Sequence, residues 1–172
     1  YTYGLNTRFY AKRRGGPLGQ VQEIISAELT QSYYSDERAS RYARQYATSS
    51  NDAPPSHFSP ILLGVRAAPS VNINATIRAE FDSRYDELRT LSATGSYNLT
   101  DRLQTTVGWS QRFFIEDLAG FNDPRYLNHY LNVSSNAHTR DNRLGAIYSF
   151  NYDVQHSAML QQRISGFYNA QC

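Results

Sequence analysis

A regular alternation of polar and apolar residues runs through four consecutive segments of this chain. Residues 61–67, 73–81, 91–99 and 103–109 place apolar side chains at every second position. Successive side chains on a β-strand point to opposite faces, so each segment has one apolar face and one polar face. The polar positions are rich in amide, hydroxyl and charged groups. This pattern is typical of a transmembrane β-barrel with a water-filled interior and an apolar exterior in contact with lipid.

The alternation predicts which residues share each face of the sheet. The residues predicted to form a polar wall facing the lumen are Glu28, Asn72, Asn74, Thr76, Arg78, Glu80, Ser92, Thr94, Ser96, Asn128, Asn132 and Asn151. The residues predicted to face lipid are Ile73, Ile77, Val107, Trp109, Tyr148 and Phe150. A hydrated polar wall accounts for the first set, and an aromatic girdle accounts for most large residues of the second.

The whole chain is predicted to be all-β, with about nine antiparallel strands that form a segment of a transmembrane barrel. The predicted strands are residues 1–12, 20–34, 60–68, 71–82, 87–99, 103–114, 127–137, 143–153 and 158–170. Residues 37–46 show weak helical spacing, but the Ser-, Asn- and Pro-rich stretch that follows favours a loop there.

The connections between the predicted strands are unequal in length. The two long ones, about residues 35–59 and 115–126, are both even-numbered and therefore leave the sheet at the same end. Outer-membrane barrels have long extracellular loops and short periplasmic turns, so both are predicted to be extracellular. The ninth strand then delivers Cys172 to the periplasmic end, where an oxidising environment lets a disulfide persist.

Composition excludes several functions. Seventeen basic and fifteen acidic residues give a net charge of +2, so nothing favours nucleic-acid binding. The 14 tyrosines and 8 phenylalanines suit interfacial girdles better than a compact soluble core. The four histidines lack the spacing of a metal site, and no motif for catalysis or for a cofactor is present. We therefore expect no enzyme, no metal and no cofactor.

Nine strands do not close into a bacterial single-chain barrel, because these barrels have an even number of strands. An open edge in hydrocarbon leaves backbone groups without partners, at several kcal/mol each. Residues 1–172 are therefore predicted to be a partial outer-membrane barrel domain whose first and last strands pair with strands outside this sequence.

Several stretches resemble the LptD family of lipopolysaccharide-assembly proteins, also called organic-solvent-tolerance proteins. They are residues 3–11, 23–34, 59–61, 127–132, 148–153, 160–163 and 168–172. The sharpest are Gln31-Ser32-Tyr33-Tyr34 and the ending Tyr168-Asn169-Ala170-Gln171-Cys172. The resemblance covers nearly the whole chain in a consistent order.

This resemblance implies a barrel of about two dozen strands in the bacterial outer membrane that transports and assembles lipopolysaccharide. It implies a small lipoprotein plug of the LptE kind, outer-membrane lipids around the barrel, and a periplasmic bridge protein that docks on an N-terminal domain outside this chain. It also implies that Cys172 forms a disulfide with a cysteine outside this chain. The family's lateral exit lies between strands that this chain does not cover.

The alternation alone is also compatible with two other interpretations. An outer-membrane porin or substrate-uptake barrel uses the same kind of strand. A soluble β-sandwich also alternates, but its apolar face would be buried against a second sheet.

Overall fold

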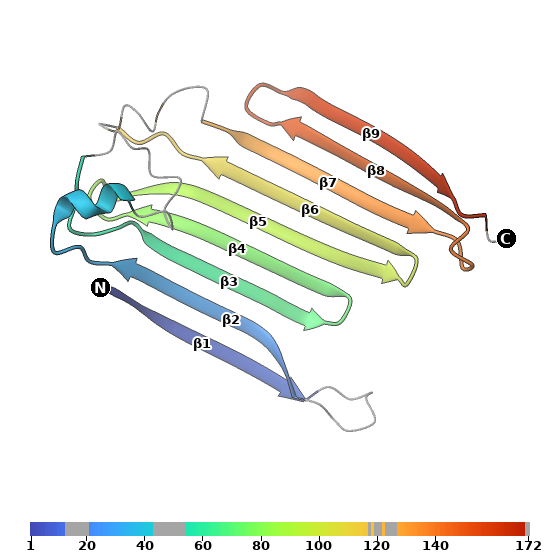
Figure 1. Cartoon of the computed structure of the whole chain (residues 1–172), viewed down its shortest axis with the longest axis horizontal. Helices are drawn as coiled ribbons and strands as arrows, with labels where there is room; N and C mark the ends of the chain where they lie inside the picture. The colour runs from blue at the N-terminus through green and yellow to red at the C-terminus, as the bar shows by residue number, and fades with distance from the viewer. Residues whose placement is uncertain (13–20, 43–53, 117, 119–121, 123–126, 171–172) are drawn as a thin grey trace.

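The computed structural model describes residues 1–12, 21–42, 54–116, 118, 122 and 127–170. Nine strands form a single sheet in the order β1 to β9, and every neighbouring pair is antiparallel (Figure 1). Their bounds are Thr2–Lys12 (β1), Val21–Ser32 (β2), Ile61–Ser70 (β3), Ile73–Asp82 (β4), Glu87–Thr100 (β5), Leu103–Arg112 (β6), His129–His138 (β7), Leu144–Asp153 (β8) and Ala158–Tyr168 (β9). The predicted all-β, nine-stranded antiparallel fold is confirmed.

The strand bounds differ from the predicted ones by a few residues. Asn72 lies in the turn between β3 and β4, whereas the sequence predicted it inside a strand. Its backbone N–H donates to the Ser70 hydroxyl at 3.2 Å, a local bond that holds the turn. Asn128 likewise lies just before β7 rather than within it, although its carbonyl accepts the Arg112 N–H of β6 at 2.9 Å.

One local prediction is wrong. Residues 37–46 were expected to form a loop, but Glu37–Tyr42 form the 3₁₀-helix η1. The Asp36 carboxylate accepts the Arg38 N–H at 2.9 Å, as a helix N-cap does, and the Asp36 carbonyl accepts the Ala39 N–H at 3.0 Å. This capping favours the helical turn despite the loop-rich sequence that follows.

The sheet has two different ends. We call the end that carries the β2–β3, β4–β5, β6–β7 and β8–β9 connections the loop end, and the opposite end the turn end (Figure 1). The two long connections leave the sheet at the loop end, together with η1. Parts of the predicted long loops, residues 43–53, 117, 119–121 and 123–126, lie outside the described residues.

The described strands form one layer with no second sheet over either face. Among the described residues, the buried hydrophobic side chains are Ile115 and Leu118, both in the β6–β7 connection. Ile77 and Val107, in the middle of the sheet, are 44% and 42% exposed. A β-sandwich would bury these side chains, so the structure does not favour that alternative.

The helical content of the described residues is small. It includes no helix with the length and apolar character needed to cross a bilayer.

Candidate functional site

The register of the sheet brings most of the predicted polar wall together on one face. Partners across an antiparallel pair point to the same side. Arg78 is opposite Ser92, and Ser92 is opposite Ser110 on the next strand, so one polar row crosses β4, β5 and β6. The predicted residues that share this face are Glu28, Asn74, Thr76, Arg78, Glu80, Ser92, Thr94, Ser96, Asn132 and Asn151.

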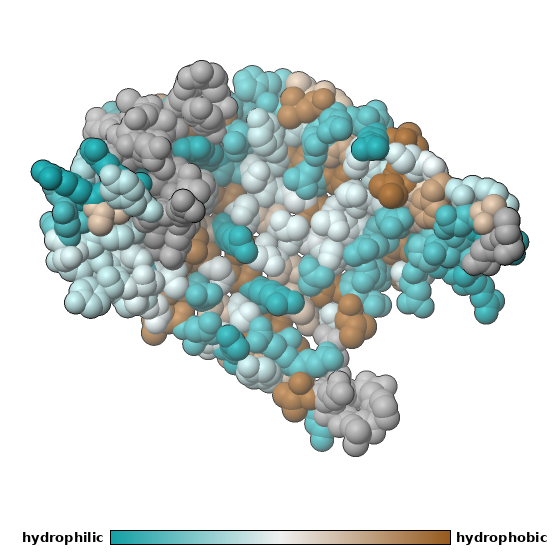
Figure 2. Space-filling view, viewed as in Figure 1, coloured by the Kyte–Doolittle hydropathy of each residue, from teal (hydrophilic) through white to brown (hydrophobic). Residues whose placement is uncertain are grey.

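The polar face is not uniformly polar. Leu62 of β3 and Ile147 of β8 lie on it, because they pair with Glu80 and Asn136. Strict alternation did not single out these two positions. In Figure 2, hydrophilic and near-neutral residues cover the middle of the sheet, and hydrophobic residues show mainly between them and along the margins.

All six residues predicted to face lipid share the opposite face. Ile77 and Trp109 both pair with Ala93, and Val107 is linked through Val133 to Phe150. Ile73 and Tyr148 belong to the same face through the intervening pairs of β5, β6 and β7.

Trp109 brings a polar group to this apolar face. Its indole Nε1–H donates to Nε2 of His129 at 2.7 Å, and the rings meet edge-on with centroids 5.5 Å apart. Nε2 must therefore be the unprotonated nitrogen of His129. This bond satisfies an indole N–H that would otherwise lack a partner on an apolar surface. No pattern in the sequence indicates this pairing, because the two residues are 20 positions apart.

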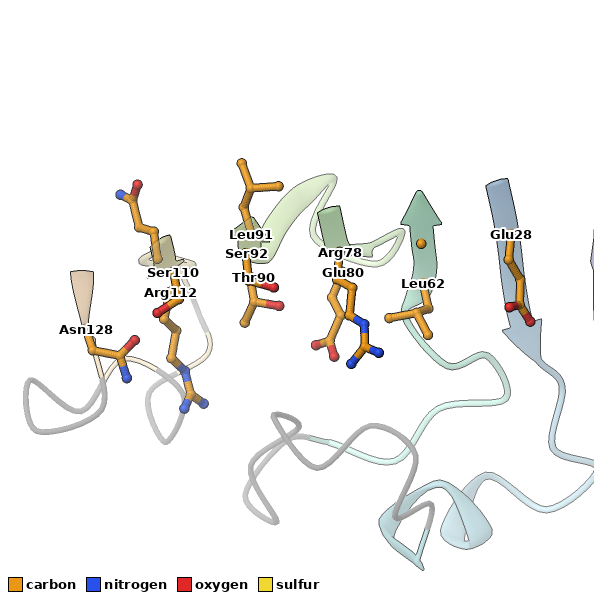
Figure 3. Close-up of a pocket in the computed structure, with 12 residues that line it drawn as sticks. Glu28, Leu62, Arg78, Glu80, Thr90, Leu91, Ser92, Ser110, Arg112 and Asn128 are labelled. Atoms are coloured by element: carbon orange, nitrogen blue, oxygen red, sulfur yellow. The ribbon is translucent and has the colours of Figure 1, made fainter. Parts of the chain in front are cut away.

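An open hollow of about 560 Å³ lies in the polar face, and we call it the polar hollow. It extends across strands β2 to β6 and reaches the residue that precedes β7. Its lining residues are Glu28, Leu62, Gly64, Arg78, Glu80, Thr90, Leu91, Ser92, Ser110, Gln111, Arg112 and Asn128. Glu28, Arg78, Glu80, Arg112 and Asn128 point to one side of the sheet, whereas Leu91 points to the other (Figure 3).

The polar hollow carries charges of both signs. Arg78 is exposed, and Gly64 stands opposite it on β3. A Cβ built on Gly64 would meet nothing nearer than the Glu28 carbonyl at 4.0 Å, so space is open beside Arg78. Glu80 is buried two positions along the same strand. The hollow therefore combines an accessible guanidinium with carboxylate, hydroxyl and amide groups.

A buried ionic cluster lies on the loop-end side of the hollow, formed by Asp82, Arg84 and Arg89; we call it the Asp82 cluster. Asp82 and Arg89 have side chains that are 1% and 0% exposed. Oδ2 of Asp82 accepts Nε–H of Arg89 at 2.8 Å, and Nη2 of Arg89 lies 2.6 Å from the same oxygen. Arg84 donates to both oxygens, from Nε at 3.0 Å and from Nη2 at 2.9 Å.

Arg84 connects the Asp82 cluster to another part of the chain. Its Nη1 donates to the Pro54 carbonyl at 3.0 Å, so the β4–β5 turn is bonded to the β2–β3 connection. Partial burial alone would lower the pKa of Arg84, but the hydrogen bonds and the charge of Asp82 outweigh it and raise the pKa. The guanidinium therefore stays charged.

Arg89 was not among the residues predicted from the sequence. It lies two positions before Leu91, so strict alternation places it on the apolar face. A register shift between Glu80 and Phe81 breaks the alternation at this point, because Thr90 pairs with Glu80 but Leu88 pairs with Phe81. This β-bulge lets Arg89 reach Asp82 on the polar side. An arginine in an apolar position beside an aspartate in the paired strand was the available signal.

The described residues contain no group of His, Asp, Glu or Cys that could hold a metal ion. His156 instead bonds Asp153 at 2.8 Å, and Nδ1 of His57 lies 2.9 Å from the Tyr34 carbonyl oxygen. Cys172, for which a disulfide was predicted, lies outside the described residues.

The comparison with protein families gives a match over the first part of the chain. The sequence model described as LptD, LPS transport system D, matches residues 1–113. This stretch contains β1 to β6, and β7 to β9 continue the same sheet beyond it. The comparison with curated proteins gives no significant match. The resembling stretches beyond residue 113 lie outside this match. The match covers more than half of the chain, and the chain therefore belongs to the LptD family of lipopolysaccharide transport, as the resemblance had predicted.

Proposed function

We propose that this chain forms part of the wall of an outer-membrane barrel that translocates lipopolysaccharide to the outer leaflet. Its polar face lines the lumen and contacts the sugar part of lipopolysaccharide or the plug lipoprotein. Its apolar face contacts outer-membrane lipid. In this role the chain catalyses no bond-making step, and the long connections at the loop end are extracellular.

The observation that carries this proposal is a single-layer sheet with one polar and one apolar face in a chain of the LptD family. A sheet that leaves Ile77 and Val107 without a covering layer needs an apolar environment on that side. The polar hollow on the other side offers hydrogen-bonding groups to a glycan. The family match favours lipopolysaccharide transport over a porin or an uptake barrel.

The edges of the sheet support the same interpretation. Among the described strands, β1 pairs only with β2 and β9 pairs only with β8. Their outer backbone groups need partners in a membrane, because water is absent there. Further strands of a larger barrel would supply those partners. The disulfide of Cys172 that the family resemblance implies stays a prediction.

Cysteine labelling in outer-membrane vesicles tests the assignment of faces. Four variants are compared, Ile77→Cys and Val107→Cys on the apolar face, and Asn74→Cys and Thr106→Cys on the polar face, with the parent protein as the control for Cys172. A lipid-soluble maleimide should label the first pair, and a membrane-impermeant maleimide that enters the lumen should label the second. The reverse pattern would contradict the proposed function.

A further inference from the structure

We propose that the polar hollow is a transit subsite for an anionic sugar, meaning a sugar unit that carries a phosphate or a carboxylate, and that Arg78 binds the anion. This inference rests on the proposed function, because the polar hollow must face the path of the glycan. It goes further by assigning one residue and one chemical class of ligand to a defined part of that path.

Arg78 is suited to bind an anion. Within the described part of the chain its side chain forms no ion pair or hydrogen bond, and it points to the polar side of the sheet (Figure 3). Gly64 beside it leaves the approach open. A guanidinium binds a phosphate or a carboxylate through two parallel N–H···O bonds. An open guanidinium in a concave surface is therefore a binding group rather than a structural one.

The rest of the hollow is suited to a sugar ring. Ser92 and Ser110 pair across β5 and β6 and present two hydroxyls in the same row as Arg78. The Asn128 amide and the Glu28 carboxylate supply further acceptors, and the amide supplies donors, for sugar hydroxyls. Leu62 offers an apolar surface for the C–H side of a ring. The volume of about 560 Å³ is within the range of small-ligand sites.

The mixed charge of the hollow is suited to transit rather than storage. A transported molecule must bind well enough to enter and weakly enough to leave. The exposed carboxylate of Glu28 lies in the same row as Arg78, across Gly64, and opposes a second negative charge. The subsite therefore attracts an anionic group without retaining it tightly.

Photo-crosslinking in living cells tests the subsite. A photoreactive amino acid replaces Ser110 inside the hollow or Thr106 on the polar face outside it, and the lipopolysaccharide adduct is quantified in the outer-membrane protein. Each is combined with Arg78→Gln, Arg78→Lys or the matched control Arg163→Gln, which removes an exposed arginine of β9 that pairs with Ser149 on the polar face.

We expect Arg78→Gln to reduce the Ser110 adduct about tenfold, as the loss of about 1.4 kcal/mol does. Arg78→Lys should retain more adduct because it keeps the charge, and Arg163→Gln should change nothing. The Thr106 adduct should be the same in all variants. An unchanged Ser110 adduct in Arg78→Gln, an equal loss in Arg163→Gln, or a protein adduct in place of lipopolysaccharide would overturn the subsite.

Two further outcomes distinguish a failure of the subsite from a failure of the proposed function. If lipopolysaccharide crosslinks at position 106, and the adduct at position 110 is the same with and without Arg78, the subsite is rejected and the proposed function stands. No lipopolysaccharide adduct at either position rejects both. Repeating the comparison in a strain whose core sugars lack phosphate distinguishes the two anions. Loss of the Arg78 effect there assigns phosphate, and its persistence assigns carboxylate.

Discussion

The two ends of the sheet differ in how their connections are held in place. At the loop end, side chains bond one connection to another, since Arg84 of the β4–β5 turn donates to the Pro54 carbonyl of the β2–β3 connection. Tyr85 of the same turn packs against Ile115 and Leu118 of the β6–β7 connection. The loop end therefore has a small tertiary structure of its own, with its own buried charges and buried apolar side chains.

At the turn end, the side chains of the described turns bond mainly within their own turn. The Ser70 hydroxyl accepts the Asn72 N–H, and the Thr100 hydroxyl accepts the Arg102 N–H. In the β7–β8 turn, Oγ1 of Thr139 donates to Asp141 at 2.6 Å. These bonds reverse the chain without joining one turn to the next through side chains. The short β4–β5 turn is part of the tertiary structure at the loop end because its side chains contact other connections, so the length of a connection does not decide whether it joins such a structure.

The largest expected difference between the ends comes from Asp82→Asn. The substitution leaves Arg89 buried without its carboxylate, and breaking a buried ion pair in this way costs about 3–5 kcal/mol. We expect faster amide hydrogen exchange in residues 84–89 and 113–115 of the protein in detergent, measured by mass spectrometry. The control Asp101→Asn changes an exposed turn-end carboxylate and should change the free energy of unfolding by no more than about 0.5 kcal/mol. Equal hydrogen exchange in the two variants would show that the buried ion pairs of Asp82 do not stabilise the loop end.

A smaller effect is expected from Ile115→Ala. Truncating a buried isoleucine costs about 2–5 kcal/mol, and we expect the lower part of that range because the apolar cluster is small and can partly collapse. Hydrogen exchange should increase near Tyr85 and leave the turn end unchanged. The matched control is Val71→Ala, in the β3–β4 turn, where the side chain is 74% exposed. A comparable response from the control would show that burial at Ile115 contributes little.

The smallest effect concerns pH at the turn end. The Thr139 hydroxyl and the Arg143 N–H donate to the Asp141 carboxylate and hold the pKa of Asp141 below its usual range. Because the folded pKa is lowered, these bonds stabilise the turn above the unfolded pKa of about 3.9 and are lost as the pH falls through the folded pKa.

The amide resonance of Thr139 reports this titration. In protein labelled at threonine, its NMR chemical shift should titrate with a midpoint below about 3.9. Asp141→Asn should abolish the titration. A midpoint at or above the ordinary value would show that the turn does not favour the charged carboxylate.

The sheet itself was predictable from sequence because a period of two needs only local information. Every second residue from Ile73 to Phe81 is apolar, and the register then groups these residues as the pattern predicts. Turn residues such as Asp101 and Arg102 marked the strand ends closely. The family match also followed the resemblance that the residues had indicated.

The parts that sequence did not predict depend on departures from regular geometry or on distant contacts. Arg89 reaches Asp82 only because a bulge breaks the alternation, and Trp109 bonds His129 only because β6 and β7 are paired. The polar hollow required knowledge of which strands are neighbours. η1 was missed because a single capping carboxylate at Asp36 outweighed an unfavourable sequence context.

The order of the strands also bears on how such a wall can be built and can evolve. Every described strand contacts only the strands next to it in sequence. A new β-hairpin can therefore pair with the strand at the edge of the sheet, without rearranging the hairpins that are already paired. For the same reason, duplication of a hairpin would widen the circumference while leaving existing pairings intact, so pore size in such proteins is open to change by small genetic steps.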